Sequence, residues 1–136
     1  MLADGEMEGI CEEGSLAFKE ICQLPSNSYG LLDCRHGPMV LFGNGTLVIA
    51  AVGACGEYEQ KLVADVCAKG AIVITVSDQP CELPDVAYNF YFGAELDPIV
   101  RGIAVLVVCQ FASYYKALVR GVNPDAPTGL DAWIKL

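Results

Sequence analysis

The chain has 136 residues and a formal net charge of −9 at pH 7. Its composition, 54% hydrophobic and 18% charged residues, excludes a disordered polypeptide and predicts one core-rich domain over residues 1–136. The excess of acidic residues leaves no basic surface for a phosphate backbone, so nucleic acid is not an expected partner.

Seven cysteines are spread along the chain without a C-x-x-C pair. Their odd number and their spacing predict neither a zinc knuckle nor a complete disulfide framework, and indicate thiols used in packing in a reducing, cytoplasmic compartment. The apolar stretch Ile99–Val119 contains Arg101, Gln110 and Lys116, which are costly in a bilayer, and the first residues carry acids in place of a basic signal region. No membrane partner is expected.

Three short apolar runs predict strands, at residues 46–52, 71–76 and 86–92. The first two lack polar alternation, which is typical of strands covered on both faces. The fold class predicted is therefore α/β, a three-layer αβα sandwich with a mainly parallel sheet.

Helical patterns separate and follow these runs. Glu57–Lys69 has one apolar face and ends at Gly70, and Asp97–Pro98 begins a long apolar helix that ends at Arg120. We expect this last helix to be buried against the sheet or against another subunit.

The first third of the chain carries different signals. Residues 12–22 predict a helix with acids at its start, residues 23–34 a surface loop, and a second short helix begins near His36 with Pro38 in its first turn.

Few residues offer catalytic chemistry. His36, the only histidine, stands at a loop-to-helix junction, where it is either an accessible catalytic group or a polar helix cap. Glu13 and Glu20 are two helical turns apart and share a face, which fits either a site or, more commonly, a solvated charged surface.

The turn Gly53–Gly56 follows a strand and precedes a helix, a place where backbone N–H groups can hold an anion. Glu57 and Glu59 would repel a phosphate there, and the dinucleotide and Walker spacings are absent. A plain βα turn is favoured. Because no cofactor fingerprint and no set of metal ligands is present, we expect neither a cofactor nor a metal.

Three motifs occur in order: EGSLAFKE at 13–20, LLDCRHGP at 31–38 and GVNPDAP at 121–127. They resemble the EGALKLKE, GELKHGP and GxxPDxPRNL motifs of the sugar isomerase (SIS) domain. The likeness covers nearly the whole chain and is strongest to the second SIS half of the glutamine:fructose-6-phosphate amidotransferases, the related phosphosugar isomerases and the deglycases. It implies a flavodoxin-like SIS fold that binds phosphorylated sugars.

The resemblance also implies roles for particular residues. Glu20 matches the glutamate that moves a proton between C1 and C2 of the sugar, and His36 matches the histidine that helps to open the ring. Glu13, Lys19 and Arg35 lie in the same motifs and are expected to contact the substrate, with Glu13 orienting groups in the site.

Several features depart from the family pattern. Ala17 stands in place of a family lysine, and Ala132 aligns with the lysine that forms a Schiff base in the synthase. The Ser/Thr-rich phosphate loop belongs to the other SIS half of the family. Only Met1–Ala3 precede Asp4, where the family has an apolar strand, so the sheet is expected to lack this first strand or to have a very short one.

A sheet with a missing strand would expose backbone and apolar area, so we expect a homodimer or a partner SIS half. Three hypotheses for function follow. The chain is a component of an aldose–ketose phosphosugar isomerase or an amidotransferase/deglycase-type enzyme, a non-catalytic phosphosugar-binding module, or a fragment with a structural role in oligomerisation.

Overall fold

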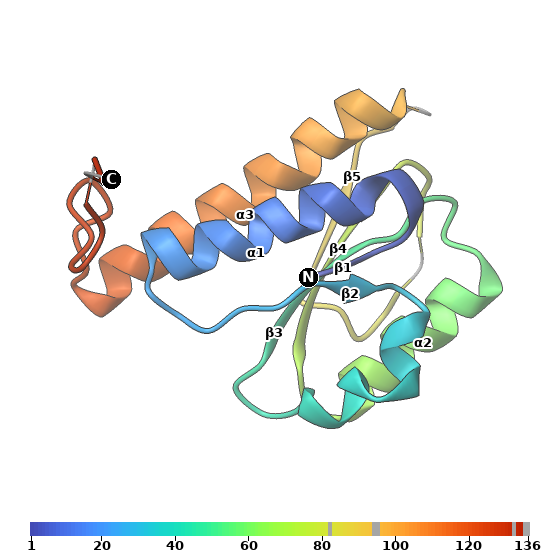
Figure 1. The fold of residues 1–136 in the computed structure, drawn as a ribbon. Coiled ribbons are helices and arrows are strands. Elements are labelled where there is room, and N and C mark those ends of the chain that lie inside the picture. The colour runs from blue at the N-terminus through green and yellow to red at the C-terminus, as the bar shows by residue number, and fades with distance from the viewer. Residues whose placement is uncertain (82, 94–95, 132, 135–136) are drawn as a thin grey trace.

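A parallel sheet of five strands forms the centre of the protein in the computed structural model, which describes residues 1–81, 83–93, 96–131 and 133–134 (Figure 1). All neighbouring strands are parallel, and their order is β2-β1-β3-β4-β5. The strands are β1 (Leu2–Ala3), β2 (Tyr29–Gly30), β3 (Leu47–Ala51), β4 (Ile72–Ser77) and β5 (Tyr88–Tyr91). The predicted mainly parallel sheet is confirmed.

Helices cover both faces of the sheet (Figure 1). Helices α1 (Glu8–Ile21) and α3 (Pro98–Arg120) pack together over one face, where Phe18, Val105 and Cys109 join a buried cluster with Ile49 and Val76. On the other face lie α2 (Glu57–Ala68) and two 3-10 turns, η2 (Asp33–His36) and η3 (Pro38–Leu41). The predicted three-layer αβα sandwich is therefore confirmed.

The first strand is present and has only two residues, so of the two alternatives expected, a missing strand or a very short one, the structure shows the very short strand. Leu2 and Ala3 are buried between β2 and β3, and Leu2 is in register with both Tyr29 and Ala50. Two residues are sufficient because hydrogen bonds on both sides hold them, although so short a strand has no periodicity that a sequence pattern could reveal.

Helix α3 begins and ends as predicted. The Asp97 carboxylate accepts a hydrogen bond from the Ile99 backbone N–H at 2.9 Å, Pro98 occupies the first turn, and Gly121 ends the helix with φ 70°. Its inner face packs closely on α1, because a Cβ on Gly14 would lie 2.7 Å from the Cys109 sulfur.

Helix α3 is buried along the face that packs on α1 and the sheet, which agrees with the expected burial against the sheet, and its outer face is uncovered. Apolar side chains along it are exposed: Ile99, Ile103, Phe111, Tyr115, Leu118 and Val119. By length and composition α3 could cross a bilayer, a test that a core helix also passes. Its packing along α1 and over the sheet is that of a core helix with one uncovered face.

The N-terminal third departs from the predicted boundaries. Helix α1 begins at Glu8, four residues before the predicted start, because a 3-10 turn, η1 (Gly5–Met7), leads directly into it. The predicted loop 23–34 includes β2, and the helix expected near His36 is divided into the turns η2 and η3. Gly37 separates these turns with φ 151°, a conformation that an α-helix cannot include.

Candidate functional site

The structure separates Glu20 and His36, the two residues for which the resemblance implies catalytic roles. Helix α1 starts beyond the carboxyl end of β1 and runs back over the sheet for about 20 Å, so Glu20 lies beside the amino edge of the strands. The turn η2, which contains His36, follows the carboxyl end of β2 on the opposite face, where Leu31 and Cys34 pack with α2. Helix α1, which carries Glu20, and the turn η2, which carries His36, therefore lie on opposite faces of the sheet (Figure 1).

The end of α1 is tied to the C-terminal segment. Arg120, in the last turn of α3, donates hydrogen bonds to the carbonyl oxygens of Cys22 at 2.7 Å and Gln23 at 2.8 Å. The Gln23 side chain in turn donates to the Thr128 carbonyl oxygen at 2.7 Å. The segment after α3 thus returns to the end of α1 that carries Glu20. Ala132, the position matched to the family lysine, lies outside the described residues.

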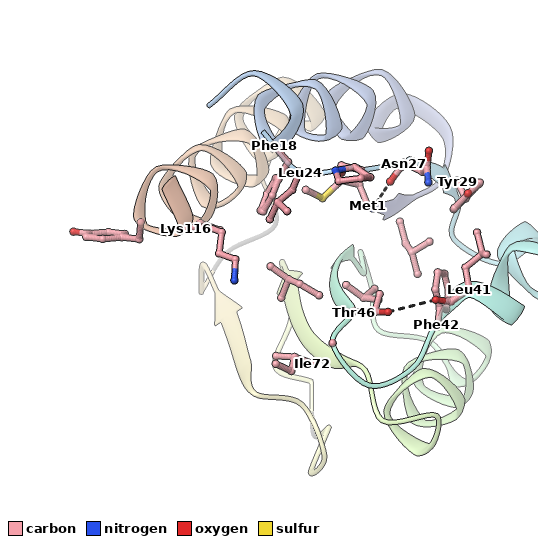
Figure 2. Close-up of a pocket in the computed structure, with 18 of the residues that line it drawn as sticks. Met1, Phe18, Leu24, Asn27, Tyr29, Leu41, Phe42, Thr46, Ile72 and Lys116 are labelled. Atoms are coloured by element: carbon pink, nitrogen blue, oxygen red, sulfur yellow. Dashed lines mark hydrogen bonds between the residues drawn. The ribbon is translucent and has the colours of Figure 1, made fainter. Parts of the chain in front are cut away.

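A cavity of about 740 Å³ opens at this same edge of the sheet (Figure 2). Its wall includes Phe18 of α1, the segment Leu24–Asn27, and the first residues of β3 and β4, Leu47 and Ile72. Lys116 extends from α3 toward it and is the only charged side chain among the described lining residues. Although the protein is acidic overall, this mostly apolar cavity near the end of α1 has a lysine at its edge.

Lys19 lies in a shallow groove next to this cavity, together with Gln23, Thr128 and the shared segment Leu24–Asn27. Its ammonium group donates to the Ser15 hydroxyl at 3.2 Å. Segment 24–27 thus lines both the cavity, together with Lys116, and the groove, together with Lys19.

Arg35 and Glu13 lie away from this edge cavity. The Arg35 guanidinium forms an ion pair with Asp65 of α2 at 2.8 Å, which joins η2 to α2. Glu13 is exposed on α1 and lines neither the cavity nor the groove. The substrate contacts expected for Glu13, Lys19 and Arg35 stay predictions.

At the carboxyl edge, the turn Gly53–Gly56 has no free anion cradle. The Glu59 carboxylate accepts hydrogen bonds from the Gly53 N–H at 3.3 Å and the Gly56 N–H at 2.6 Å. The Glu59 carboxylate thus occupies the backbone N–H donors that a phosphate would need. This agrees with the plain βα turn that the sequence favours.

Sequence reasoning missed an ion pair at this carboxyl edge. Arg101 on α3 lies 3.1 Å from the carboxylate of Asp78, which follows β4 and is 5% exposed. The Arg101 guanidinium also packs on Gly53, where an added Cβ would lie 3.1 Å from it. The only signal in the sequence was an arginine within an apolar helix.

A disulfide joins Cys55 to Cys81, with their Cα atoms 5.8 Å apart. The spacing of the cysteines in the sequence did not indicate this pair. The disulfide therefore differs from the expectation that the thiols are used for packing. Four of the five remaining cysteines follow that expectation, since Cys11, Cys22, Cys34 and Cys109 are buried, whereas Cys67 is partly exposed. Desolvation raises the pKa of Cys11 to about 11 and that of Cys109 to about 12. Among the described residues, no group of three His, Cys, Asp or Glu side chains could hold a metal ion.

The parallel αβα sandwich carries the EGSLAFKE motif on α1 and the RHGP motif after β2, and both motifs resemble those of the sugar isomerase domain. Known sequences agree. The chain is 32% identical over 122 residues to the glutamine–fructose-6-phosphate aminotransferase [isomerizing] of Methanothermobacter thermautotrophicus, and 31% identical over 121 residues to that of Thermococcus kodakarensis. Each match covers 87% of this chain and about a fifth of the relative (21% and 20%). No family model matches the chain.

Solved structures show the same fold. Glucosamine-6-phosphate deaminase from Thermotoga maritima is 29% identical with a TM-score of 0.73, over 96% of this chain and 38% of that one. Tagatose-6-phosphate ketose/aldose isomerase from Escherichia coli has a TM-score of 0.81 at 21% identity, over 95% of this chain and 37% of that one. The chain therefore resembles a SIS domain, and among SIS domains the second half of the aminotransferases, with proteins of phosphosugar metabolism as its relatives.

Proposed function

We propose that the chain is one SIS half of a cytoplasmic phosphosugar isomerase, or of an amidotransferase/deglycase-type enzyme, whose active site a second SIS half completes. Glu20 moves a proton between C1 and C2 of a phosphorylated sugar, and His36 assists ring opening. A carboxylate can carry a proton between neighbouring carbons, and an imidazole can donate or accept one near neutral pH.

The separation of Glu20 and His36 carries this proposal. A single chain holds them on opposite faces of its sheet, so each site would take Glu20 from one chain and His36 from another. Such sharing of residues is possible in a two-fold dimer, because each contact between the two chains then occurs twice and creates two equivalent sites.

The uncovered face of α3 supports a second chain on independent grounds. Its apolar residues Ile99, Ile103 and Val119 are 58% to 82% exposed, and a contiguous apolar surface of this kind is typical of an interface. Since the chain spans about a fifth of its curated relatives, the occupant that we propose for this face is a second SIS half.

Complementation between two inactive variants tests the shared site. Glu20→Gln and His36→Ala are each expected to abolish conversion of fructose 6-phosphate to glucose 6-phosphate. Mixed after unfolding and refolding, a homodimer would regain about one quarter of wild-type turnover, because half of the dimers are mixed and one of their two sites is intact. No recovery, with wild-type turnover present, would show that both residues act in one chain.

A non-catalytic phosphosugar-binding or oligomerisation module is the second candidate. Ala17 favours it, because this buried residue of α1 places a methyl group where the family has a lysine. A thermal-shift titration with fructose 6-phosphate separates the candidates when it is combined with NMR detection of product. A saturable rise in Tm without product identifies the binding module, since a ligand of the folded state stabilises it.

A further inference from the structure

We propose that Cys55 and Cys81 form a reversible disulfide that fastens the β3–α2 turn to the loop between β4 and β5, and that a small disulfide such as oxidised glutathione can form it. This redox site is independent of the proposed catalytic residues. The backbone places Cys55 and Cys81 within the Cα separation that a disulfide requires.

Neighbouring parallel strands bring the cysteines together. Cys55 follows β3 and Cys81 follows β4, and these strands are paired over their full length, from Leu47 with Ile72 to Ala51 with Val76. Both cysteines therefore emerge at the carboxyl edge of the sheet. Their Cα separation of 5.8 Å is the usual one for a disulfide.

The backbone of each cysteine accepts a hydrogen bond from a side chain of a neighbouring element, α2 for Cys55 and β5 for Cys81. The Gln60 side chain donates to the Cys55 carbonyl oxygen at 2.7 Å, and the Asn89 side chain donates to the Cys81 carbonyl oxygen at 2.9 Å. These contacts do not involve sulfur, so they can hold the two thiols near each other when the disulfide is open. A pair that is held in this way can close again.

The backbone at Cys55 has φ 53°, a left-handed conformation that is unfavourable for a residue with a side chain. The disulfide and the Gln60 contact hold this conformation against its cost. Opening the disulfide removes one of these two restraints, so reduction is expected to loosen the β3–α2 turn.

The exposure of the two sulfur-bearing residues sets the order of the exchange. Cys81 is partly exposed, whereas Cys55 is buried. The Cys81 thiolate attacks one sulfur of oxidised glutathione, and the first glutathione thiolate leaves. The Cys55 thiolate then attacks the Cys81 sulfur and displaces the second glutathione. Two electrons pass from the cysteine pair to the glutathione disulfide, and the two cysteine protons end on the two glutathione thiols.

Four of the other five cysteines are too buried to compete for this exchange. Cys11, Cys22, Cys34 and Cys109 are buried, and desolvation raises the pKa of all four thiols. Cys67 is partly exposed on α2 and is not bonded to another cysteine. Cys67 is therefore the matched control residue.

The test equilibrates the full chain in buffers that range from reduced to oxidised glutathione, and counts thiols after denaturation by maleimide mass shift. Wild type is expected to change from seven thiols to five. Cys55→Ser and Cys81→Ser should keep six thiols throughout, and Cys67→Ser should change from six to four. Reduction is expected to lower the Tm of wild type and Cys67→Ser by about 5 to 10 °C, and to leave the other two variants unchanged.

Peptide mapping of the oxidised chain should locate the bond between residues 55 and 81. Seven thiols at every glutathione ratio would overturn the proposal, as would a bond that maps to another pair. Five thiols even in excess reduced glutathione would overturn its reversibility. The disulfide between Cys55 and Cys81 should form equally well in Glu20→Gln. The disulfide can therefore be confirmed or overturned independently of the proposed catalytic role of Glu20.

Discussion

Arg101 on α3 lies 3.1 Å from the carboxylate of Asp78 at the end of β4, and the two side chains are largely buried together. Helix α3 is thereby attached to the carboxyl edge of the sheet through a charge pair in a poorly hydrated place. Removing one member leaves the other charge buried without its counter-charge. The free-energy cost of that unpaired charge exceeds the net stabilisation that the intact pair provides.

Arg101→Ala is therefore expected to lower the free energy of unfolding by about 3 kcal/mol, measured by urea denaturation. The double variant Arg101→Met with Asp78→Asn should lose less than Arg101→Ala, because no unpaired charge remains. If the double variant were the less stable of the two, the ion pair would be a net source of stability, contrary to this prediction.

Gly14 is required by the close packing of α1 on α3. Gly14→Ala places a methyl group 2.7 Å from the Cys109 sulfur and is expected to destabilise the fold by about 1–3 kcal/mol. Gly9→Ala is the matched control on the same helix, because nothing lies within 4 Å of the added atom. It should stabilise by up to about 1 kcal/mol through helix propensity. Equal effects at both positions in thermal unfolding would contradict the close contact.

Arg120 stabilises the end of α1 through its hydrogen bonds to the carbonyl oxygens of Cys22 and Gln23. Arg120→Ala is expected to cost about 1–2 kcal/mol of stability and to increase amide hydrogen exchange in the last turn of α1. Lys116→Ala, one turn earlier on α3, is the control and should leave that exchange unchanged. Unaltered protection in Arg120→Ala would show that the end of α1 is held by other contacts.

Burial of the Cys109 thiol predicts a loss of stability at alkaline pH. Desolvation raises the pKa of Cys109 from 9.0 to about 12, so above pH 9 the unfolded chain releases a proton that the folded chain retains. Stability is complete below pH 9 and declines as the pH rises toward 12. Cys109→Ala should make the free energy of unfolding fall less steeply above pH 9, after correction for its lower starting value. A slope unchanged by the substitution would contradict burial as the cause.

Local signals were sufficient for most of the secondary structure. The strands 46–52 and 71–76 carry continuous apolar runs, and helix 98–120 has Asp97 at its start and Gly121 at its end, so periodicity and capping chemistry located them within a residue or two. The signals failed at Leu2–Ala3 and Tyr29–Gly30, because a two-residue strand is defined by its neighbours in the sheet and by nothing in its own sequence.

The α/β class, the parallel sheet and, through the motifs, the resemblance to the sugar isomerase domain could all be predicted from the amino-acid sequence. Which residues meet in space depends on the topology of the folded chain. In a parallel sheet each connection crosses back over the length of the strands, so Glu20 and His36, close in sequence, lie apart on opposite faces. The same topology brings Cys55 to Cys81 and Arg101 to Asp78, because segments that follow neighbouring strands emerge at one edge.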